Sequence, residues 1–471
     1  MNLVAIVNAA VMLMFAGVMG LVALIYPDTR AVFGEGFVLA GALGLFLIAA
    51  SLGRRRPLTR VQTFVLTSSV WLTGGLAGAL PLEIWGMPMV DAIFESISGL
   101  TTTGATVMSG LDTLPHGILL WRAVLQAFGG VGFIVTGMAL LPVLSTGGMQ
   151  LFRTESSDKG EKELRNAAQF ALATMAVYVG LIGLCGLVYH LGGMGVFDAA
   201  THAMTTLSTG GYSNYDSSFG HFQSPFLQWT GTVFMLLGGL PFAWYIRAAY
   251  RRQFRSEQVV WLLRTLAGAI GVLALWLWLT SGRGFWESLR VVAFNVISVV
   301  TTTGYATEDF LAWGPFAVAM FFFLTAMGGC TGSTAGGAKM MRWIIFFRAV
   351  KSSVRKIHSP HAVSPIRYEG RQVGDDVLRG VATFFLFYFL TIAVLAAALA
   401  LGGLDFLTSI SGAMTAVANV GPGVGDIIGP AGNFASLDNL EKILLVFGMF
   451  VGRLEMLTVY VLFTGAFWRE V

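Results

Sequence analysis

Long apolar runs recur along this chain, and they restrict its fold more than any other feature. Runs at 4–26, 37–52, 170–190, 259–280 and 381–401 approach or exceed the roughly 20 apolar residues that a helix needs to cross a membrane. The mean hydropathy is +0.74, and only 11% of the residues are charged, unlike a soluble domain. Because lipid cannot hydrogen-bond open backbone groups, the spans should be helical. The sequence therefore predicts an all-α, multi-pass membrane protein.

Lys and Arg cluster in alternate connections between the apolar runs. The clusters lie at 54–60, 153–165, 247–255 and 351–371, whereas 82–120, 193–226 and 403–440 contain no Lys or Arg. In the segment 281–313, three acids outnumber Arg283 and Arg290. The basic connections are therefore expected on the cytoplasmic side, together with both chain ends. This orientation explains the net charge of +4 better than a nucleic-acid partner, which we do not expect.

The four segments that alternate with the basic clusters are expected to face outward, and they share a polar motif within apolar surroundings. These segments are 82–120, 193–226, 281–313 and 403–440. The motifs are "TTTGAT", "LSTGGYS", "TTTGYA" and "ANVGPG", aligned on Gly104, Gly210, Gly304 and Gly421. A mostly apolar stretch precedes each motif, at 90–100, 196–207, 286–300 and 406–418. At roughly 11 to 15 residues, these stretches are too short to cross a membrane. We expect them to be re-entrant half-helices.

A span lies on either side of each half-helix, which gives four repeats of span, half-helix, loop and span. The flanking spans are 63–82 with 121–144, 170–190 with 227–250, 259–280 with 316–347, and 381–401 with 443–467. We therefore expect about ten transmembrane helices, divided into two leading helices (1–60) and four repeats (61–150, 151–256, 257–370 and 371–471).

Repetition of this kind predicts pseudosymmetry, with a site where the repeats meet. Four re-entrant loops around one axis would form a pore lined by main-chain carbonyls, which can replace the hydration shell of potassium. The carboxyl ends of the half-helices carry a negative partial charge, which favours a cation. Thr and Gly also seal ordinary contacts between membrane helices. Four aligned copies, each after a half-helix, favour the pore.

Two further features lie outside the loops. "GGCTGSTAGGAK" at 328–339 interrupts a span with residues that destabilise a helix, and it is either a mobile segment or a tight packing seam. Arg453 is expected in the middle of the last span, where a charge is costly. It is expected to be functional or paired with Glu455, and the two roles are compatible. Glu95 and Asn295, nine residues before Gly104 and Gly304, are expected either to hold the loops by hydrogen bonds or simply to pack.

On these motifs the chain resembles the Trk/Ktr/HKT superfamily of potassium transporters, and most closely its bacterial TrkH and KtrB membrane subunits. The resemblance covers nearly the whole chain, and it implies a potassium selectivity filter formed by Thr102, Thr103, Gly104, Ser208, Thr209, Gly210, Thr302, Thr303, Gly304, Asn419, Val420 and Gly421. It also implies an intramembrane gate beneath the filter, formed by Gly328, Gly329, Cys330, Thr331, Gly332, Ser333, Thr334, Ala335, Gly336, Gly337 and Arg453.

The same resemblance implies the setting of the protein. It predicts potassium uptake across the bacterial cytoplasmic membrane by a homodimer, under the control of a cytosolic nucleotide-binding subunit of the TrkA or KtrA type. Apart from potassium in the pore, no cofactor is expected. A Na⁺- or H⁺-coupled symporter of the same superfamily remains an alternative. A membrane enzyme is disfavoured, because the sequence has neither a GxSxG-type nucleophile motif nor paired intramembrane carboxylates.

Overall fold

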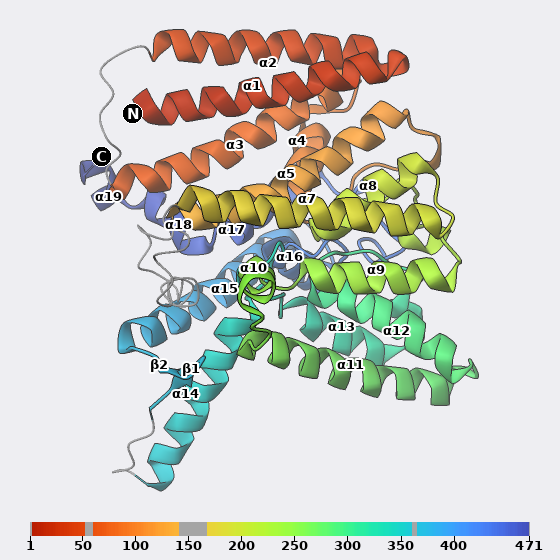
Figure 1. Cartoon of the computed structure of the whole chain (residues 1–471), viewed down its shortest axis with the longest axis vertical. Helices are drawn as coiled ribbons and strands as arrows, with labels where there is room; N and C mark the ends of the chain where they lie inside the picture. The colour runs from red at the N-terminus through yellow and green to blue at the C-terminus, as the bar shows by residue number, and fades with distance from the viewer. Residues whose placement is uncertain (1, 52–59, 141–166, 360–364, 471) are drawn as a thin grey trace.

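The computed structural model describes residues 2–51, 60–140, 167–359 and 365–470, and helices dominate it (Figure 1). The helices α1 (Asn2–Ile25) and α2 (Arg30–Ala50) pack against each other at one end of the bundle. The basic connections predicted at 54–60 and 153–165 lie mostly or wholly outside the described residues, as does the predicted boundary between the first two repeats at 150/151.

The four repeats follow in chain order. The first contains α3 (Arg60–Ile84), α4 (Met89–Leu100) and α5 (His116–Leu140), and the second α7 (Ala167–Leu191), α8 (Val196–Leu207), α9 (Pro225–Gly238) and α10 (Phe242–Arg251). The third contains α11 (Glu257–Ser281), α12 (Phe285–Val300), α13 (Pro315–Thr325) and α14 (Met340–His358), and the fourth α15 (Asp375–Leu401), α16 (Phe406–Ala418), α17 (Asn439–Arg453), α18 (Met456–Tyr460) and α19 (Gly465–Glu470).

Short elements complete the fold. The 3₁₀ helices are η1 (Pro27–Thr29), η2 (Leu111–Thr113), η3 (Ser218–His221), η4 (Phe310–Trp313) and η5 (Val461–Phe463). The strands β1 (Arg367–Tyr368) and β2 (Arg371–Gln372) form one antiparallel hairpin between α14 and α15.

The half-helices α4, α8, α12 and α16 begin and end within one residue of the predicted stretches. Pro88, Gly195, Gly284 and Asp405 stand at their N-caps, where such residues favour a change from extended to helical backbone. The side chain of Asp405 accepts hydrogen bonds from the main-chain N–H groups of Leu407 and Thr408. Each half-helix packs against the long helix that precedes it, which brings it into the interior of the bundle.

Three of the predicted spans are broken. The span 227–250 consists of α9 and α10, which meet at 89° across Gly239 and Pro241, and the last span bends by 111° between α17 and α18. The span 316–347 is divided into α13 and α14 by the glycine-rich segment 328–339. Within the described residues, six helices are long and apolar enough to cross a membrane, or eight spans if each bent pair is counted as one.

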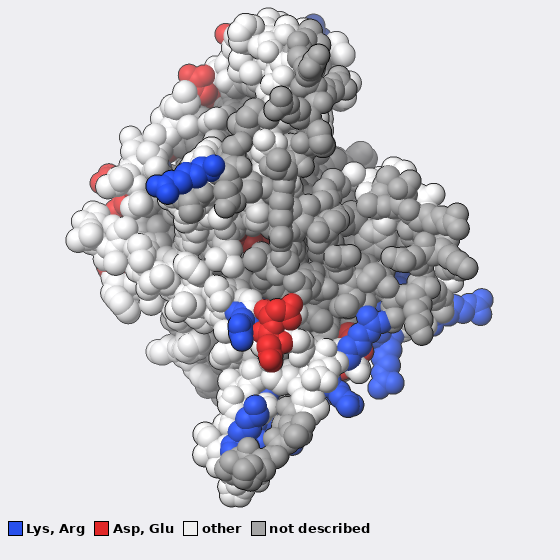
Figure 2. Space-filling view, turned by 90° about the vertical axis from the view of Figure 1, so that its left-hand side faces the viewer, with Lys and Arg blue, Asp and Glu red and all other residues white. Residues whose placement is uncertain are grey.

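The two chain ends lie on the same side of the bundle (Figure 1). The face on that side carries several Lys and Arg side chains, most of them in the lower half of the view in Figure 2. From the bundle's end opposite α1 and α2, α14 projects outward, with Phe347, Val354 and Ile357 exposed along it.

Candidate functional site: four loops and the segment beneath them

Each half-helix is followed by a residue whose backbone is left-handed. These residues are Thr102, Thr209, Thr302 and Asn419, with φ between 52° and 58°. Such a conformation is unfavourable for the three β-branched threonines, so the surrounding structure must impose it there, whereas asparagine adopts it more readily. The same unusual turn therefore occurs in all four repeats, and it provides a common reference for comparing them.

The hydrogen bonds give the same alignment of the four loops. The main-chain N–H of the residue after each left-handed position donates to the carbonyl five residues earlier: Thr103 to Ser98, Gly210 to Thr205, Thr303 to Ser298 and Val420 to Thr415, over 2.8–3.1 Å. A glycine with positive φ comes next in each loop, namely Gly104, Gly211, Gly304 and Gly421.

This comparison corrects the sequence alignment of the second repeat by one residue. Alignment on Gly210 pairs Ser208, Thr209 and Gly210 with the triplets beginning at Thr102, Thr302 and Asn419, but the triplet with the equivalent backbone is 209–211. The motif "STGG" has two consecutive glycines, and the second of them has the positive φ. We call residues 102–104, 209–211, 302–304 and 419–421 loops 1 to 4.

The four loops contact one another in a closed ring. A Cβ atom on Gly104 would lie 2.1 Å from the carbonyl oxygen of Gly210, and one on Gly211 would lie 1.8 Å from that of Thr303. A Cβ atom on Gly304 would lie 2.1 Å from the carbonyl oxygen of Val420, and one on Gly421 would lie 2.8 Å from that of Thr103. Each loop therefore places a main-chain carbonyl against the glycine of its neighbour, and the fourth loop returns to the first.

Side-chain hydrogen bonds support loops 1, 3 and 4 of the ring. The hydroxyls of Thr101 and Thr103 are 2.8 Å apart, and those of Thr301 and Thr303 are 2.9 Å apart. The Asn419 amide donates to the hydroxyl of Thr103 (3.0 Å) and to the carbonyl of Met449 (2.9 Å). These hydroxyls are thus engaged with other side chains. A cavity of about 420 Å³ is lined by the glycines of all four loops, Gly104, Gly211, Gly304 and Gly421.

On the half-helices of the first three repeats, a polar side chain holds the chain that leaves the loop of the same repeat. Seven residues before the left-handed position stand Glu95, His202 and Asn295, all fully buried. Glu95 accepts from the main-chain N–H of Val107, and Asn295 donates to the Thr307 hydroxyl. Of the two alternatives left open for Glu95 and Asn295, hydrogen bonding is therefore the one observed. In the second repeat the equivalent contact is made by His202, whose Nε2 lies 3.0 Å from the Ser213 hydroxyl.

The equivalence of His202 was not recognised from the sequence. With the second loop aligned on Gly210, His202 lies eight residues before the glycine, instead of nine as Glu95 and Asn295 do. Alignment on Gly211 restores the spacing of nine. The consecutive glycines were the signal that the alignment of this repeat was ambiguous.

The glycine-rich segment 328–339 lies against the other side of the ring from the cavity. The Thr334 hydroxyl donates to the carbonyls of Leu207 (2.9 Å) and Gly238 (3.0 Å), and it accepts from the Thr209 hydroxyl (3.2 Å). The main-chain N–H of Gly336 donates to the Thr302 hydroxyl (2.7 Å). The segment is thus hydrogen-bonded to the left-handed threonines of loops 2 and 3.

All of the residues predicted for the gate lie in this segment or contact it. The sharp turns fall at Gly328, Gly332 and Gly337, each with positive φ, and the N–H of Cys330 donates to the carbonyl of Gly239. These contacts exceed those of a simple helix-packing seam, because the backbone here is irregular and reaches into the loops.

Arg453 lies at the last residue of α17, at the 111° bend, and not in the middle of a straight span. Its guanidinium donates to the carbonyl of Thr334 (2.9 Å) and to that of Gly129 (3.2 Å). The carboxylate of Glu455, considered as its partner, forms an ion pair with Arg342 on α14. Arg453 therefore connects the glycine-rich segment to the repeat 1 helix α5.

Comparison with known proteins identifies the family. A sequence model of the TrkH family, described as a cation transport protein, matches residues 30–279 and 285–470. The chain belongs to the TrkH family. It is 48% identical over 417 residues to the Trk system potassium uptake protein TrkI of Halomonas elongata, which covers 87% of this chain and 84% of that protein. It is 35% identical to the Trk system potassium uptake protein TrkH of Escherichia coli (strain K12), over 97% of each chain.

The fold also matches a solved member of the TrkH family. The crystal structure of the potassium transporter TrkH from Vibrio parahaemolyticus superposes with a TM-score of 0.90 at 30% identity, over 99% of both chains. The predicted all-α, multi-pass fold with four re-entrant repeats is thereby confirmed. The named relatives are transport proteins, in agreement with the expectation that this chain is not an enzyme.

Proposed function

We propose that this TrkH family member conducts potassium across the membrane through the ring of loops 1 to 4. The observation that carries the proposal is the closed ring, in which each loop presents a main-chain carbonyl to the glycine of the next. Uncharged oxygens arranged in this way replace the hydration shell of a potassium ion. The relatives named as potassium uptake proteins support the same cargo.

The selectivity filter consists of residues 102–104, 209–211, 302–304 and 419–421. The carboxyl ends of α4, α8, α12 and α16 lead directly into it, and their partial negative charge attracts a cation. The cavity lined by the four glycines serves as the outer vestibule. Potassium is the transported ion, and no other cofactor is needed.

The glycine-rich segment, from Gly328 to Gly337, acts as the gate. Its hydrogen bonds to Thr209 and Thr302 support this role. In the proposed closed state the segment lies under the filter and blocks the path of the ion. Arg453 holds it closed through the carbonyl of Thr334. Opening the pore requires these contacts to break, so a partner that displaces the segment regulates conduction.

The partners are a second copy of the chain and a cytosolic nucleotide-binding subunit of the TrkA or KtrA type. The exposed apolar side chains of α14, among them Phe347, Val354 and Ile357, support the homodimer. The protein resides in the bacterial cytoplasmic membrane with both ends in the cytoplasm. The Lys and Arg side chains on the face that carries the chain ends support this orientation (Figure 2).

Cation flux into proteoliposomes tests the proposal. Purified protein and a variant that lacks residues 330–336 are compared for uptake of K⁺, Rb⁺, Na⁺ and Li⁺, with and without Na⁺ and H⁺ gradients. We expect K⁺ and Rb⁺ flux to exceed Na⁺ and Li⁺ flux, and to rise when the segment is shortened. Flux that requires a Na⁺ or H⁺ gradient would favour a coupled symporter, and no cation flux from either protein would refute the pore.

A further inference from the structure

A buried ion pair lies at the boundary between loops 1 and 2. Nε of Arg122 on α5 donates to Oε1 of Glu95 on α4 over 2.8 Å, and the two side chains are 2% and 0% exposed. The Glu95 carboxylate also accepts from the Thr106 hydroxyl (2.9 Å) and from the N–H of Val107 (3.0 Å). Glu95 thus holds the chain that leaves loop 1, two to three residues after Gly104.

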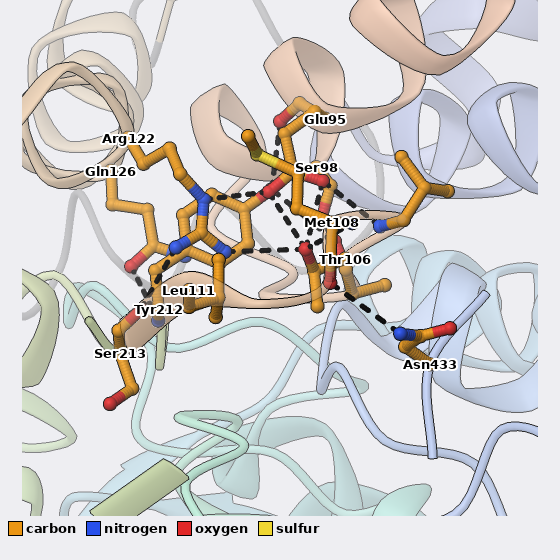
Figure 3. Close-up of polar contacts among 12 residues, drawn as sticks. Glu95, Ser98, Thr106, Met108, Leu111, Arg122, Gln126, Tyr212, Ser213 and Asn433 are labelled. Atoms are coloured by element: carbon orange, nitrogen blue, oxygen red, sulfur yellow. Dashed lines mark hydrogen bonds and ion pairs between the residues drawn. The ribbon is translucent and has the colours of Figure 1, made fainter. Parts of the chain in front are cut away.

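Arg122 extends the same cluster to loop 2. Its Nη1 donates to the carbonyl of Ser213 (2.9 Å), and its Nη2 donates to the Thr106 hydroxyl (3.2 Å) (Figure 3). The guanidinium lies 4.1 Å from the centre of the Tyr212 ring. One cation therefore touches the chain leaving loop 1 and the chain leaving loop 2.

Tyr212, which follows loop 2, reaches back to the first repeat. Its hydroxyl donates to the carbonyls of Glu95 (2.8 Å) and Ala105 (3.2 Å), although Tyr212 itself directly follows Gly211 of loop 2. Glu95, Arg122 and Tyr212 therefore form one hydrogen-bonded cluster across this boundary, beside the hydrogen bonds of Gln126 to the Gly210 carbonyl and the Tyr212 N–H.

The other repeats lack an equivalent charge. The positions that correspond to Glu95 are His202, Asn295 and Gly412, so the carboxylate occurs in the first repeat alone. A buried ion pair is seldom retained for its stability, because removing two charges from water offsets much of their attraction. A role specific to the boundary of loops 1 and 2 explains its presence better.

We propose that the Glu95–Arg122 pair is a positioning device that sets the preference of the filter for potassium over sodium. The proposal rests on the function proposed above. At this boundary Gly104 lies against the carbonyl of Gly210, one of the oxygens of the ring. If either Glu95 or Arg122 loses its charge, the remaining charge is buried without compensation and attracts water or new partners. The chains leaving loops 1 and 2, which the pair holds, are then displaced. Selectivity depends on the number and placement of the carbonyls, so it falls.

The test compares Glu95→Gln with Asp91→Asn. Asp91 lies one turn earlier on α4 and pairs over 2.7 Å with Lys442, a residue of helix α17 and not of a chain that leaves a loop. Both variants remove the carboxylate of an ion pair from the same half-helix. The readouts are the K⁺/Na⁺ flux ratio in proteoliposomes and the thermal stability in detergent. We expect Glu95→Gln to lower the ratio about tenfold, equivalent to ~1.4 kcal/mol between the two ions, and Asp91→Asn to leave the ratio unchanged.

Two further variants apply if Glu95→Gln fails to fold. Arg122→Lys keeps the charge but loses the planar fork that reaches Glu95, Thr106 and Ser213 together, and Tyr212→Phe removes only the hydroxyl. We expect both to lower the ratio while potassium flux persists. A wild-type ratio in the folded variants would overturn the proposal, as would an equal loss in Asp91→Asn. Absence of potassium flux both in the wild-type protein and in the variant lacking residues 330–336 would instead refute the proposed function.

Discussion

Gly211 is the position at which substitution most directly tests the geometry of the ring. A Cβ atom there would lie 1.8 Å from the carbonyl oxygen of Thr303 and 2.8 Å from its carbonyl carbon, and both are main-chain atoms of the adjacent loop. Ordinary contact begins at about 3.4 Å, so one loop must move by more than about 1 Å. The positive φ of 76° adds a further ~1–2 kcal/mol for any residue with a Cβ.

Gly210 provides the matched control for Gly211→Ala. The three atoms nearest to a Cβ atom on Gly210 would all belong to the side chain of Gln126, at 2.3–2.7 Å, and the φ of Gly210 is not positive. A side chain moves at lower cost than the backbone of a neighbouring loop, although Gln126 is itself buried. We therefore expect Gly211→Ala to disturb the ring much more than Gly210→Ala does.

The assay is the K⁺/Na⁺ flux ratio of the two variants in proteoliposomes, with the amount of folded protein measured by size-exclusion chromatography. For Gly211→Ala we expect the K⁺/Na⁺ flux ratio to fall by about tenfold or more. A displaced carbonyl reduces the free-energy preference of the ring for K⁺ over Na⁺, and a tenfold fall corresponds to ~1.4 kcal/mol. A loss as large in Gly210→Ala, or a wild-type ratio in Gly211→Ala, would refute the alignment and the ring of contacts derived from it.

Three other predictions follow from single contacts. Arg453→Gln removes the charged donor to the Thr334 carbonyl and should raise potassium flux in the absence of a regulatory subunit, whereas Arg264→Gln, an exposed residue of α11, should not. Gln126→Leu leaves the carbonyl of Gly210 and the N–H of Tyr212 without this partner, so we expect a loss of about 1–3 kcal/mol of stability, measured by thermal unfolding in detergent; an unchanged melting temperature would contradict it. Hydrogen bonds from Thr408 and the N–H of Leu407 hold the pKa of the exposed Asp405 carboxyl below its ordinary value. The cap therefore stabilises the protein above that ordinary value and is lost as the pH falls through the lowered pKa, so Asp405→Ala should cost about 1 kcal/mol at neutral pH and progressively less in acid; a cost that does not change with pH would argue against the cap.

The half-helices were predictable because local sequence determines them. Each is bounded by a capping or helix-breaking residue at its start, such as Pro88 or Asp405, and by the polar loop at its end. Their shortness relative to a membrane span was enough to predict that they are re-entrant. The motif of the fourth loop, "ANVGPG", lacks the threonines of the others, but its half-helix was still predictable because the same pattern occurs in the other three repeats.

The alignment of loop 2 was not predictable in the same way. Either glycine of "STGG" can be aligned with the glycine of the other three motifs, and only the backbone conformation distinguishes Gly210 from Gly211. That conformation depends on contact with Thr303, nearly a hundred residues away in the chain. The role of His202 was missed for the same reason, because its equivalence with Glu95 follows only from the corrected alignment.

The break at 328–339 was predicted from its glycines, whereas the breaks in the spans 227–250 and 443–467 were missed, although the first of these two carried a local signal. "GGLP" at 238–241 joins two glycines to a proline, which favours a helix end, yet the apolar composition on both sides favoured one continuous span. The bend after Arg453 has no glycine or proline at the break, where Glu455 adopts a φ of 63°. Its carboxylate pairs with Arg342 on another repeat, a tertiary contact that the local sequence does not reveal.

Selection of potassium by the four-loop ring is tested most directly by the reversal potential of a planar bilayer that contains the purified protein, with equal concentrations of KCl on one side and NaCl on the other. The variant lacking residues 330–336 is used, so that the pore is not blocked. A reversal potential strongly displaced toward the potassium equilibrium potential is the predicted result. A current that reverses near zero would show that the ring does not distinguish the two ions and would contradict the account.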